Sequence, residues 1–328
     1  MSRADALTRP VPRAAATKAV TRRISGDTVF KAVTQLFAVS ILGILLAMVG
    51  GMLVESLPAL KEFGWRFPGS SEWDAVQGLF GALPFIWGSL VSSLLAIALA
   101  TPLAVGCALF MTEVVPQRLS GLISSLVELL AAIPSVIYGL WGVLVMAPWL
   151  QRTVQPFLAE HFDVLPFFRG APYGVSMMAA VLILMIMIVP IITSISKEVL
   201  LTVPRSQKEA AIALGATRWE TIRMAVLPYG RSGIMGAVIL GLGRAIGETM
   251  AVTMVIGNTP QISLSLLAPA YTMPSVIANE FAETTSKLHG AALMEIGLLL
   301  MVITLAVNVL ARILIWSVGR NGAAGGRT

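Results

Sequence analysis

The chain has 328 residues, of which 56% are hydrophobic and only 12% are charged, and its mean hydropathy is +0.84. Soluble domains carry roughly 25% charged residues, so this composition excludes an ordinary soluble globular fold and favours a membrane protein with a lipid-facing surface. The net charge of +6 does not indicate nucleic-acid binding, because in a membrane protein the placement of Lys and Arg matters more than their sum.

Residues 1–30 form a basic tail, and the first apolar run follows at residues 32–54. This run is longer than the apolar core of a signal peptide and lacks a small-residue cleavage site, so we interpret it as an uncleaved first membrane span. A spanning helix needs ~20 mostly apolar residues. Windows of this kind predict five further spans, at residues 75–112, 129–151, 170–196, 232–257 and 290–316.

The six spans predict an all-α, polytopic membrane protein. We expect a membrane domain over residues 31–318, with a polar loop at 204–228, and a C-terminal tail at 319–328. If both termini lie on one side, 17 of the 23 Lys and Arg fall on that side and five on the other, with Arg244 inside a span. The positive-inside rule then places the termini and the polar loop in the cytoplasm of a multi-pass cell-membrane protein.

The polar loop contains SQKEAAIALGATRWETIRMAVLP between two apolar spans. Ser206 and Glu209 have the spacing of a helix-capping box, and so do Thr217 and Glu220. Gly215 stands where a left-handed residue would end the first helix. The sequence therefore predicts two short helices joined by a tight turn.

One face of the second predicted helix is apolar. Trp219, Ile222 and Val226 recur at spacings of three and four, and we expect this stripe to pack against the underside of the membrane domain. Ala210 and Ala211 keep the first helix thin, which lets another surface approach it closely. The loop is therefore predicted to be a contact element.

The pattern E-A-A-x3-G-x9-I-x-L-P in this loop resembles the cytoplasmic signature of binding-protein-dependent ABC import permeases. The chain has Glu209, Ala210 and Ala211, then Gly215 at the expected offset, and it departs only at Ala225, where the family has Ile. The resemblance implies a six-helix permease bundle of the MetI-like type. It also implies that these residues form a coupling helix, which docks on a separate ATPase subunit.

Three further segments are similar to the phosphate-import branch of this family: ELLAAIPSVIYGLWG (128–142), GRAIGETMAVTMVIGN (243–258) and LLAPAYTMPSVIANEF (266–281). The resemblance implies a permease for inorganic phosphate whose ATP hydrolysis takes place on partner chains, so that this chain is not itself an enzyme. The implied partners are ATPase subunits, a sister permease, a phosphate-binding protein and membrane lipid, without nucleic acid.

Arg244 and Glu248 are four residues apart in the fifth predicted span. A charge at that depth costs about 2.5–3.5 kcal/mol, so each needs a partner or a water-filled path. The two side chains can pair with each other, and the planar guanidinium also suits phosphate oxygens. We interpret them as part of the substrate path. The alternative is a static ion pair that fixes helix packing.

Several remaining features predict no chemistry. Glu295 is expected near a span end with its carboxylate in water, and His289 in a loop or an interface. The segment 266–281 contains two prolines and is expected to be a short re-entrant or surface piece, or a plain loop. The sequence has no HExxH, no GxxxxGK[ST] and one cysteine, so we expect no catalytic residue, metal site, cofactor or disulfide.

Other classes of function stay open from the residues alone. A permease for another oxyanion, such as sulfate or molybdate, would use the same arginine. An ion-coupled secondary transporter would show inverted repeats and broken-helix binding sites, which the sequence does not display. A membrane scaffold or sensor would bind an ATPase through the polar loop without transport.

Overall fold

The structure is a computed structural model that describes residues 26–284 and 286–324. The chain divides into two compact units, residues 1–49 and 50–328, and each is described by itself. The basic tail predicted over residues 1–30 lies almost entirely outside the described residues.

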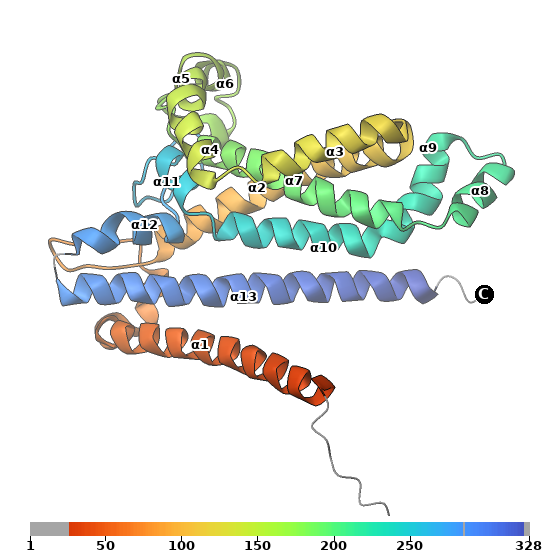
Figure 1. The fold of residues 1–328 in the computed structure, drawn as a ribbon. Helices are drawn as coiled ribbons and strands as arrows, with labels where there is room; N and C mark the ends of the chain where they lie inside the picture. Colours follow the sequence, from red (N-terminus) through yellow and green to blue (C-terminus); the bar gives the residue numbers. More distant parts are fainter. Residues whose placement is uncertain (1–25, 285, 325–328) are drawn as a thin grey trace, which may run out of the picture. The chain divides into compact units, whose positions relative to one another are not determined.

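Every named element in the described part of the chain is a helix, which confirms the all-α prediction (Figure 1). Strand-like pairing is confined there to two single bridges, Asp74 with Leu79 and Gly257 with Ala270. The α-helices are α1 (Gly26–Phe63), α2 (Leu83–Leu109), α3 (Gln117–Ala131), α4 (Ser135–Trp141), α5 (Ala147–Trp149), α6 (Gln155–His161), α7 (Met177–Leu201), α8 (Arg205–Ala213), α9 (Arg218–Thr221), α10 (Leu227–Ile246), α11 (Met250–Val255), α12 (Met273–Glu280) and α13 (Lys287–Ala324). Short 3-10 and π-helical turns connect or extend them: η1 (Gly64–Gly69), η2 (Phe110–Val114), η3 (Gly142–Met146), η4 (Leu150–Val154), η5 (Pro166–Phe168), η6 (Ile222–Val226) and η7 (Phe281–Glu283).

The described part of the smaller unit, residues 26–49, is helical throughout and belongs to α1. Its large apolar side chains are exposed on all sides of the helix, with Phe30 at 71% and Ile44 at 68%. A helix that is apolar all round must lie in a protein interior or in lipid. This segment therefore suits a membrane-spanning position.

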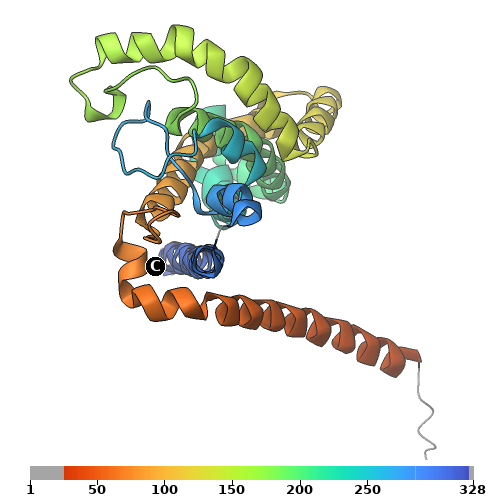
Figure 2. The same ribbon diagram turned by 90° about the vertical axis from the view of Figure 1, so that its left-hand side faces the viewer.

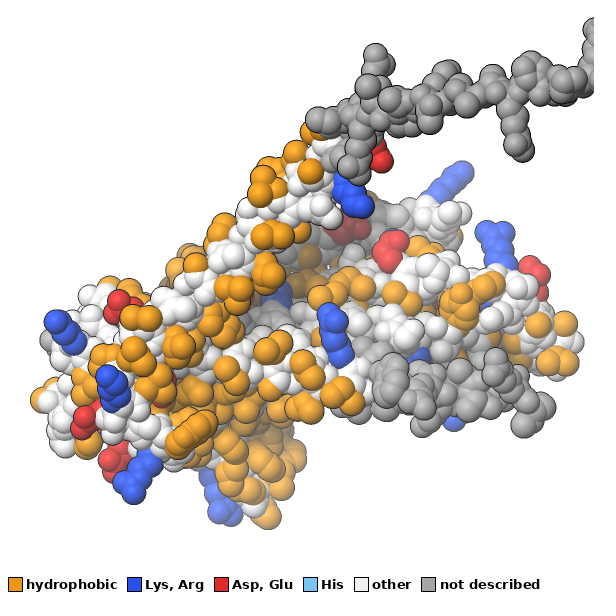
Figure 3. Space-filling model, turned by 90° about the horizontal axis from the view of Figure 1, so that it is seen from below, with side chains coloured by type: hydrophobic (Ala, Val, Ile, Leu, Met, Phe, Trp, Pro, Cys, Tyr) orange, Lys and Arg blue, Asp and Glu red, His pale blue; other side chains and the backbone are white. Residues whose placement is uncertain are grey.

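Five helical runs in the described chain are long and apolar enough to cross a membrane, and a bent pair of helices supplies a sixth if it is counted as one span. The five runs are Val29–Gly69, Leu83–Val114, Met177–Leu201, Arg218–Ile246 and Lys287–Ile313, and the bent pair is Gln117–Ala131 with Ser135–His161. Apolar side chains cover much of the face seen in Figure 3. The predicted polytopic membrane protein is confirmed.

The centre of the larger unit is built from α2, α7 and α10. Alanines at every fourth position of α2 are fully buried, and their small side chains allow α7 to approach closely. The hydroxyl of Thr193 on α7 donates to the carbonyl of Ala104 on α2 at 3.3 Å. On α10, a Cβ added at Gly241 would lie 2.9 Å from Ile192 of α7. Small residues thus set the spacing of these three helices.

The third predicted span, residues 129–151, is not a single straight helix. The chain bends by 85° between α3 and the run from α4 to α6. Pro134 occupies the N-cap position of α4 in an extended conformation, which stops α3 and starts the new direction. The Tyr138 hydroxyl donates to the carbonyl of Leu130 across the bend at 2.8 Å. Figure 2 shows the run from α4 to α6 as one long curved rod turned away from α3.

The fifth predicted span, residues 232–257, is also corrected. The helical run begins earlier, at Arg218, and α10 ends at Ile246. Gly247 ends α10, and α11 begins at Met250. The predicted window therefore combined the end of one helix with a separate short helix, because the break falls within an apolar sequence.

Candidate functional site

The polar loop forms a helical hairpin, defined here as residues 204–221, in which α8 and α9 are joined by a tight turn. Gly215 has a φ of +86°, the left-handed conformation predicted for it. The predicted capping box at the start of α9 is also present. Glu220 Oε2 accepts from the Thr217 amide at 2.8 Å, and the Glu220 amide donates to Thr217 Oγ1 at 3.3 Å. Local sequence signals therefore determined the turn correctly.

The capping box predicted at the start of α8 is wrong. Pro204 is the N-cap residue, Arg205 is the first helical residue, and no side chain caps the helix. Ser206 thus lies inside the first turn instead of before it. The extended ψ of Pro204, 135°, lets the helix begin directly after it. Ser206 is then two positions too late to act as the N-cap.

Three apolar side chains of the hairpin face outward. Ile212 is 57% exposed, Leu214 89% and Trp219 64%. We expected Trp219 to pack inward with Val226, but only Val226 is fully buried. The π-helical turn η6 explains the difference. Residues five apart share a face in such a turn, so Val226 shares its buried face with Thr221.

The residues of the E-A-A-x3-G pattern lie mainly on the surface of the hairpin. Glu209, Ala210 and Gly215 are exposed, and a Cβ added at Gly215 would meet nothing within 4 Å. Ala211 is buried, and its carbonyl accepts from the Ala216 amide at 3.1 Å. Ala211 therefore stabilises the turn, while the other residues of the pattern are accessible.

Arg244 and Glu248 do not lie on one helical face, because α10 ends between them. Arg244 is exposed in the last turn of α10, whereas Glu248 is 8% exposed. The carboxylate of Glu248 accepts from the Ala251 amide at 3.3 Å, in the first turn of α11. No ion pair joins Arg244 and Glu248, both of which the structure describes. The static pair that we considered from the sequence is therefore not formed.

Glu295 is buried, against expectation. Its side chain lies on α13 in a residue that is 4% exposed, and its Oε2 atom has no hydrogen-bond partner among the described residues. The sequence placed it near a span end, but packing of neighbouring helices against α13 removes it from water.

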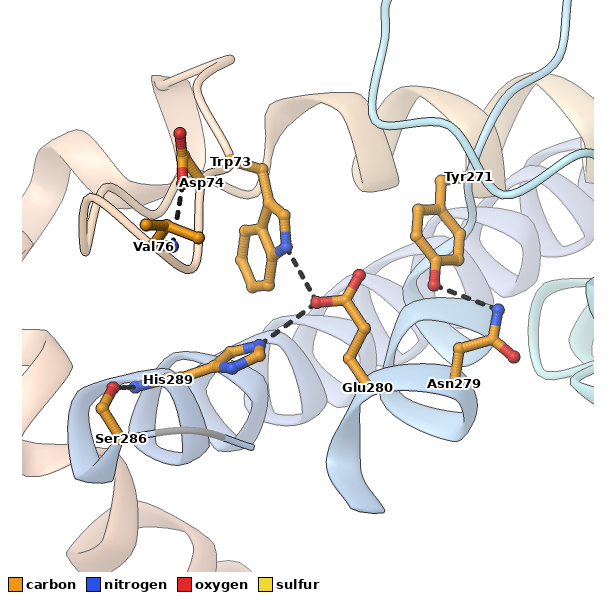
Figure 4. Close-up of polar contacts among 8 residues, drawn as sticks. All are labelled: Trp73, Asp74, Val76, Tyr271, Asn279, Glu280, Ser286 and His289. Carbon is orange, nitrogen blue, oxygen red and sulfur yellow. Dashed lines mark hydrogen bonds and ion pairs between the residues drawn. The ribbon is translucent and has the colours of Figure 1, made fainter. Parts of the chain in front are cut away.

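A partly buried polar cluster at the start of α13 was missed (Figure 4). Glu280 Oε2 accepts from the Trp73 indole nitrogen at 3.0 Å and lies 3.1 Å from His289 Nε2. The His289 ring is 3% exposed, and Phe80 stacks on it at 5.3 Å. Trp73 and Glu280 are 207 residues apart, so no local pattern could have brought them together.

This cluster, defined as Trp73, Glu280 and His289, fixes the segment before α2 to both α12 and α13. Next to it, the Tyr271 hydroxyl accepts from the Asn279 amide nitrogen at 3.1 Å. Burial raises the pKa of Tyr271 to about 12, so the phenol is neutral at physiological pH. The segment 266–281, left open between loop and re-entrant piece, thus contains a short helix, α12, whose first residues are buried.

Helices that span a membrane, together with a polar hairpin that exposes most of the E-A-A-x3-G residues, define a membrane-embedded transport permease. Residues 100–319 match the family described as "Binding-protein-dependent transport system inner membrane component". The chain belongs to this family, and it is accordingly a multi-pass inner-membrane protein.

Two relatives and one solved structure give the comparison its detail. "Phosphate transport system permease protein PstC" of Mesorhizobium japonicum is 45% identical over 319 residues, which cover 96% of this chain and 98% of that protein. The protein of the same name from Haemophilus influenzae is 44% identical over 293 residues, 88% of this chain and 93% of its own length. The crystal structure of a bacterial alginate ABC transporter with its periplasmic protein is similar in fold, with a TM-score of 0.57 and 17% identity, covering 88% of this chain and 94% of that one.

Proposed function

We propose that this chain is the PstC-type permease subunit of an ABC importer for inorganic phosphate. The observation that carries the proposal is the 45% identity with a phosphate transport permease over 96% of the chain. The match runs along nearly the full length of both proteins and therefore includes the spans as well as the hairpin. The exposed E-A-A-x3-G residues support it independently.

The hairpin is proposed as the docking element for PstB-like ATPase subunits. Glu209, Ala210 and Gly215 are accessible, and they lie in the same hairpin as the exposed side chains of Leu214 and Trp219. Large apolar side chains in a surface element are typical of protein interfaces. Ala211 stabilises the turn between α8 and α9 through its backbone carbonyl. The ATPase surface would thereby cover residues that water now contacts.

A PstA-like sister permease and a PstS-like binding protein complete the proposed transporter, with lipid around the bundle. The charge distribution supports the orientation. With the hairpin and both termini in the cytoplasm, 17 Lys and Arg lie on the cytoplasmic side and five on the other. The end of the bundle that carries α12 then faces the binding protein.

Arg244 and Glu248 are proposed to act at different points of the substrate path. The exposed guanidinium of Arg244 offers a planar fork of donors that fits two phosphate oxygens. Glu248 is buried and accepts from the α11 backbone. This contact supports a role in stabilising the interruption between α10 and α11, so that the two do not form one continuous helix. A break of this kind lets polar backbone line a path through the membrane.

The proposed mechanism is alternating access. Closure of the ATPase dimer on ATP moves the hairpins, and the two permease bundles shift between outward and inward access while Arg244 holds the anion in transit. No covalent bond to substrate forms on this chain. The permease contributes the path, its charge and the mechanical connection.

The experiment is uptake of radiolabelled phosphate into proteoliposomes that contain the assembled transporter. Uptake that needs ATP and is blocked by vanadate supports the importer. Uptake driven by an ion gradient alone would indicate a secondary transporter instead of an ABC importer. Preferred uptake of sulfate or molybdate would indicate that the substrate is another oxyanion. Assembly with an ATPase without any uptake would favour a scaffold or sensor.

A further inference from the structure

We infer that Lys208 and Glu113 form a positioning pair that transmits movement of the hairpin to α2 during ATP-driven import, an inference that rests on the proposed function. The Lys208 ammonium lies 2.6 Å from a carboxylate oxygen of Glu113. Lys208 is on α8 of the hairpin, and Glu113 is on η2, the π-helical turn that extends α2. The two residues are 95 positions apart in the sequence.

The polypeptide itself connects the hairpin to only two long helices. Residues 202–203 join it to α7, and η6 joins it to α10. Across the described chain, the Lys208–Glu113 contact is the single hydrogen bond or ion pair between the hairpin and a residue outside 199–228. The hairpin's polar connection to α2 therefore depends on two side chains.

A small apolar cluster lies where the roots of the hairpin meet α2. Its buried members come from α2, from the end of α7 and the residues just after it, and from η6 and α10: Ala108, Leu200, Val203, Val226 and Ile234. Apolar contacts of this kind hold helices together but are not directional. A short charge-assisted hydrogen bond is directional. The ion pair therefore restricts movement of the hairpin relative to α2 in a direction along which the apolar contacts alone would let the two slide.

The environment of the pair makes it more than a surface contact. The Lys208 side chain is 25% exposed and that of Glu113 is 15% exposed. Fully exposed pairs are weakened by solvent and salt, whereas partly buried pairs are screened much less. Loss of one partner would also leave the other charge partly buried and unpaired.

α2 is suited to carry the movement across the membrane domain. With η2 it forms a continuous run of 32 residues, ~48 Å long at 1.5 Å per residue. Near its other end, the Ser89 hydroxyl accepts from the Met273 amide of α12 at 2.9 Å. A displacement applied at Glu113 therefore acts on a continuous helical run that reaches the element that we propose faces the binding protein.

The test measures phosphate uptake and ATP hydrolysis on the same proteoliposomes of the assembled transporter. Lys208→Met and Glu113→Gln each break the pair, and we expect phosphate imported per ATP to fall by ~5-fold or more, while the ATPase subunits still copurify. The exchanged variant, Lys208→Glu with Glu113→Lys, restores opposite charges and is expected to recover most of the lost ratio. A pair that serves only folding would change yield without changing this ratio.

Arg205→Met is the matched control. It removes a positive charge from the same helix, at an exposed residue for which the structure records no ion pair, so the ratio should not change. The inference is overturned if the single variants keep the wild-type ratio, if the exchanged variant is as defective as they are, or if the single variants lose the ATPase. Failure of the unmodified transporter to import phosphate with ATP would instead refute the proposed function.

Discussion

The two ends of α2 are held by different kinds of contact. At the Leu83 end, α2 lies beside α12, and the cluster of Trp73, Glu280 and His289 connects three segments through partly buried hydrogen bonds (Figure 4). At the opposite end, one ion pair joins the hairpin to α2, next to a small apolar cluster formed by α2 and the segments that flank the hairpin, while Leu214 and Trp219 face outward.

The difference indicates that the end of α2 near α12 is held in place by the protein itself, whereas the end near the hairpin is available to a partner protein. Breaking a buried hydrogen bond costs the full desolvation of the group left behind, so the α12 end resists rearrangement. The hairpin end forms few bonds to the rest of the bundle and has exposed apolar surface that only another molecule can cover. Mutations at the first end should therefore reduce stability, and mutations at the second should reduce coupling.

The largest effect is expected between the two ends, at the break after α10. Arg244→Ala should reduce phosphate uptake by at least ~100-fold, because the role that we propose for Arg244 gives it two charge-assisted hydrogen bonds to the anion, while the complex still assembles. Uptake of radiolabelled phosphate by cells measures it, with copurification of the partners as the check. Arg231→Ala, an exposed arginine at the other end of the same helix, is the control. Normal uptake by Arg244→Ala would remove this residue from the path.

The next effect tests the partner-facing end. Leu214→Asp places a charge where Leu214 is 89% exposed, so the fold should be unchanged. Binding of the ATPase should weaken by at least ~10-fold, because apolar contacts near the centre of an interface carry much of its energy. Copurification and titration with the isolated ATPase measure this. Val76→Asp, at an apolar residue that is 97% exposed in the segment before α2, should bind normally. Equal loss in both variants would contradict the docking assignment.

A smaller effect tests the fixed end. Glu280→Ala leaves the Trp73 indole and the His289 ring without their partner, at a cost of about 2 kcal/mol in stability. We expect a lower unfolding midpoint in detergent and faster hydrogen exchange at the start of α13, with little change in ATPase binding. The neighbouring Glu283 is exposed and makes no ion pair in the described structure, so Glu283→Ala should behave as wild type. An unchanged midpoint for Glu280→Ala would mean that the cluster does not fix this end.

The smallest effect distinguishes the two capping sequences. Thr217→Ala removes the capping box of α9 and should cost about 1 kcal/mol locally, seen as faster amide exchange in α9 with uptake only slightly reduced. Ser206→Ala changes a residue with the same sequence spacing but no capping bond in the structure, so exchange in α8 should stay the same. Similar changes in both helices would show that Ser206 caps α8 after all.

Much of the fold could be predicted because its signals are local. Long apolar runs identified spans, and Gly215 with Thr217 and Glu220 identified the turn of the hairpin. Errors arose where the chain changes direction without a change in hydropathy. The 85° bend at Pro134 and the end of α10 at Ile246 both fall inside apolar windows. Hydropathy reports whether lipid tolerates a segment and says nothing of its direction.

The candidate sites divide in the same way. The E-A-A-x3-G residues were found from spacing, and Arg244 and Glu248 from their charge within an apolar run. The absence of an ion pair between Arg244 and Glu248 was not predictable, because it depends on whether the helix continues between them. The exposure of Trp219 depends on the π-helical turn η6, which could not be predicted from the residues that form it.

The sequence by itself determined that this chain crosses a membrane repeatedly and carries one polar hairpin, because the length of apolar runs and the residues of a tight turn act over a few neighbours. The tertiary structure alone decided which polar side chains meet. Trp73 reaches Glu280 and Lys208 reaches Glu113 only after the helices have packed. Contacts over 207 and 95 residues depend on how helices pack side by side, and spacing along the chain does not specify it.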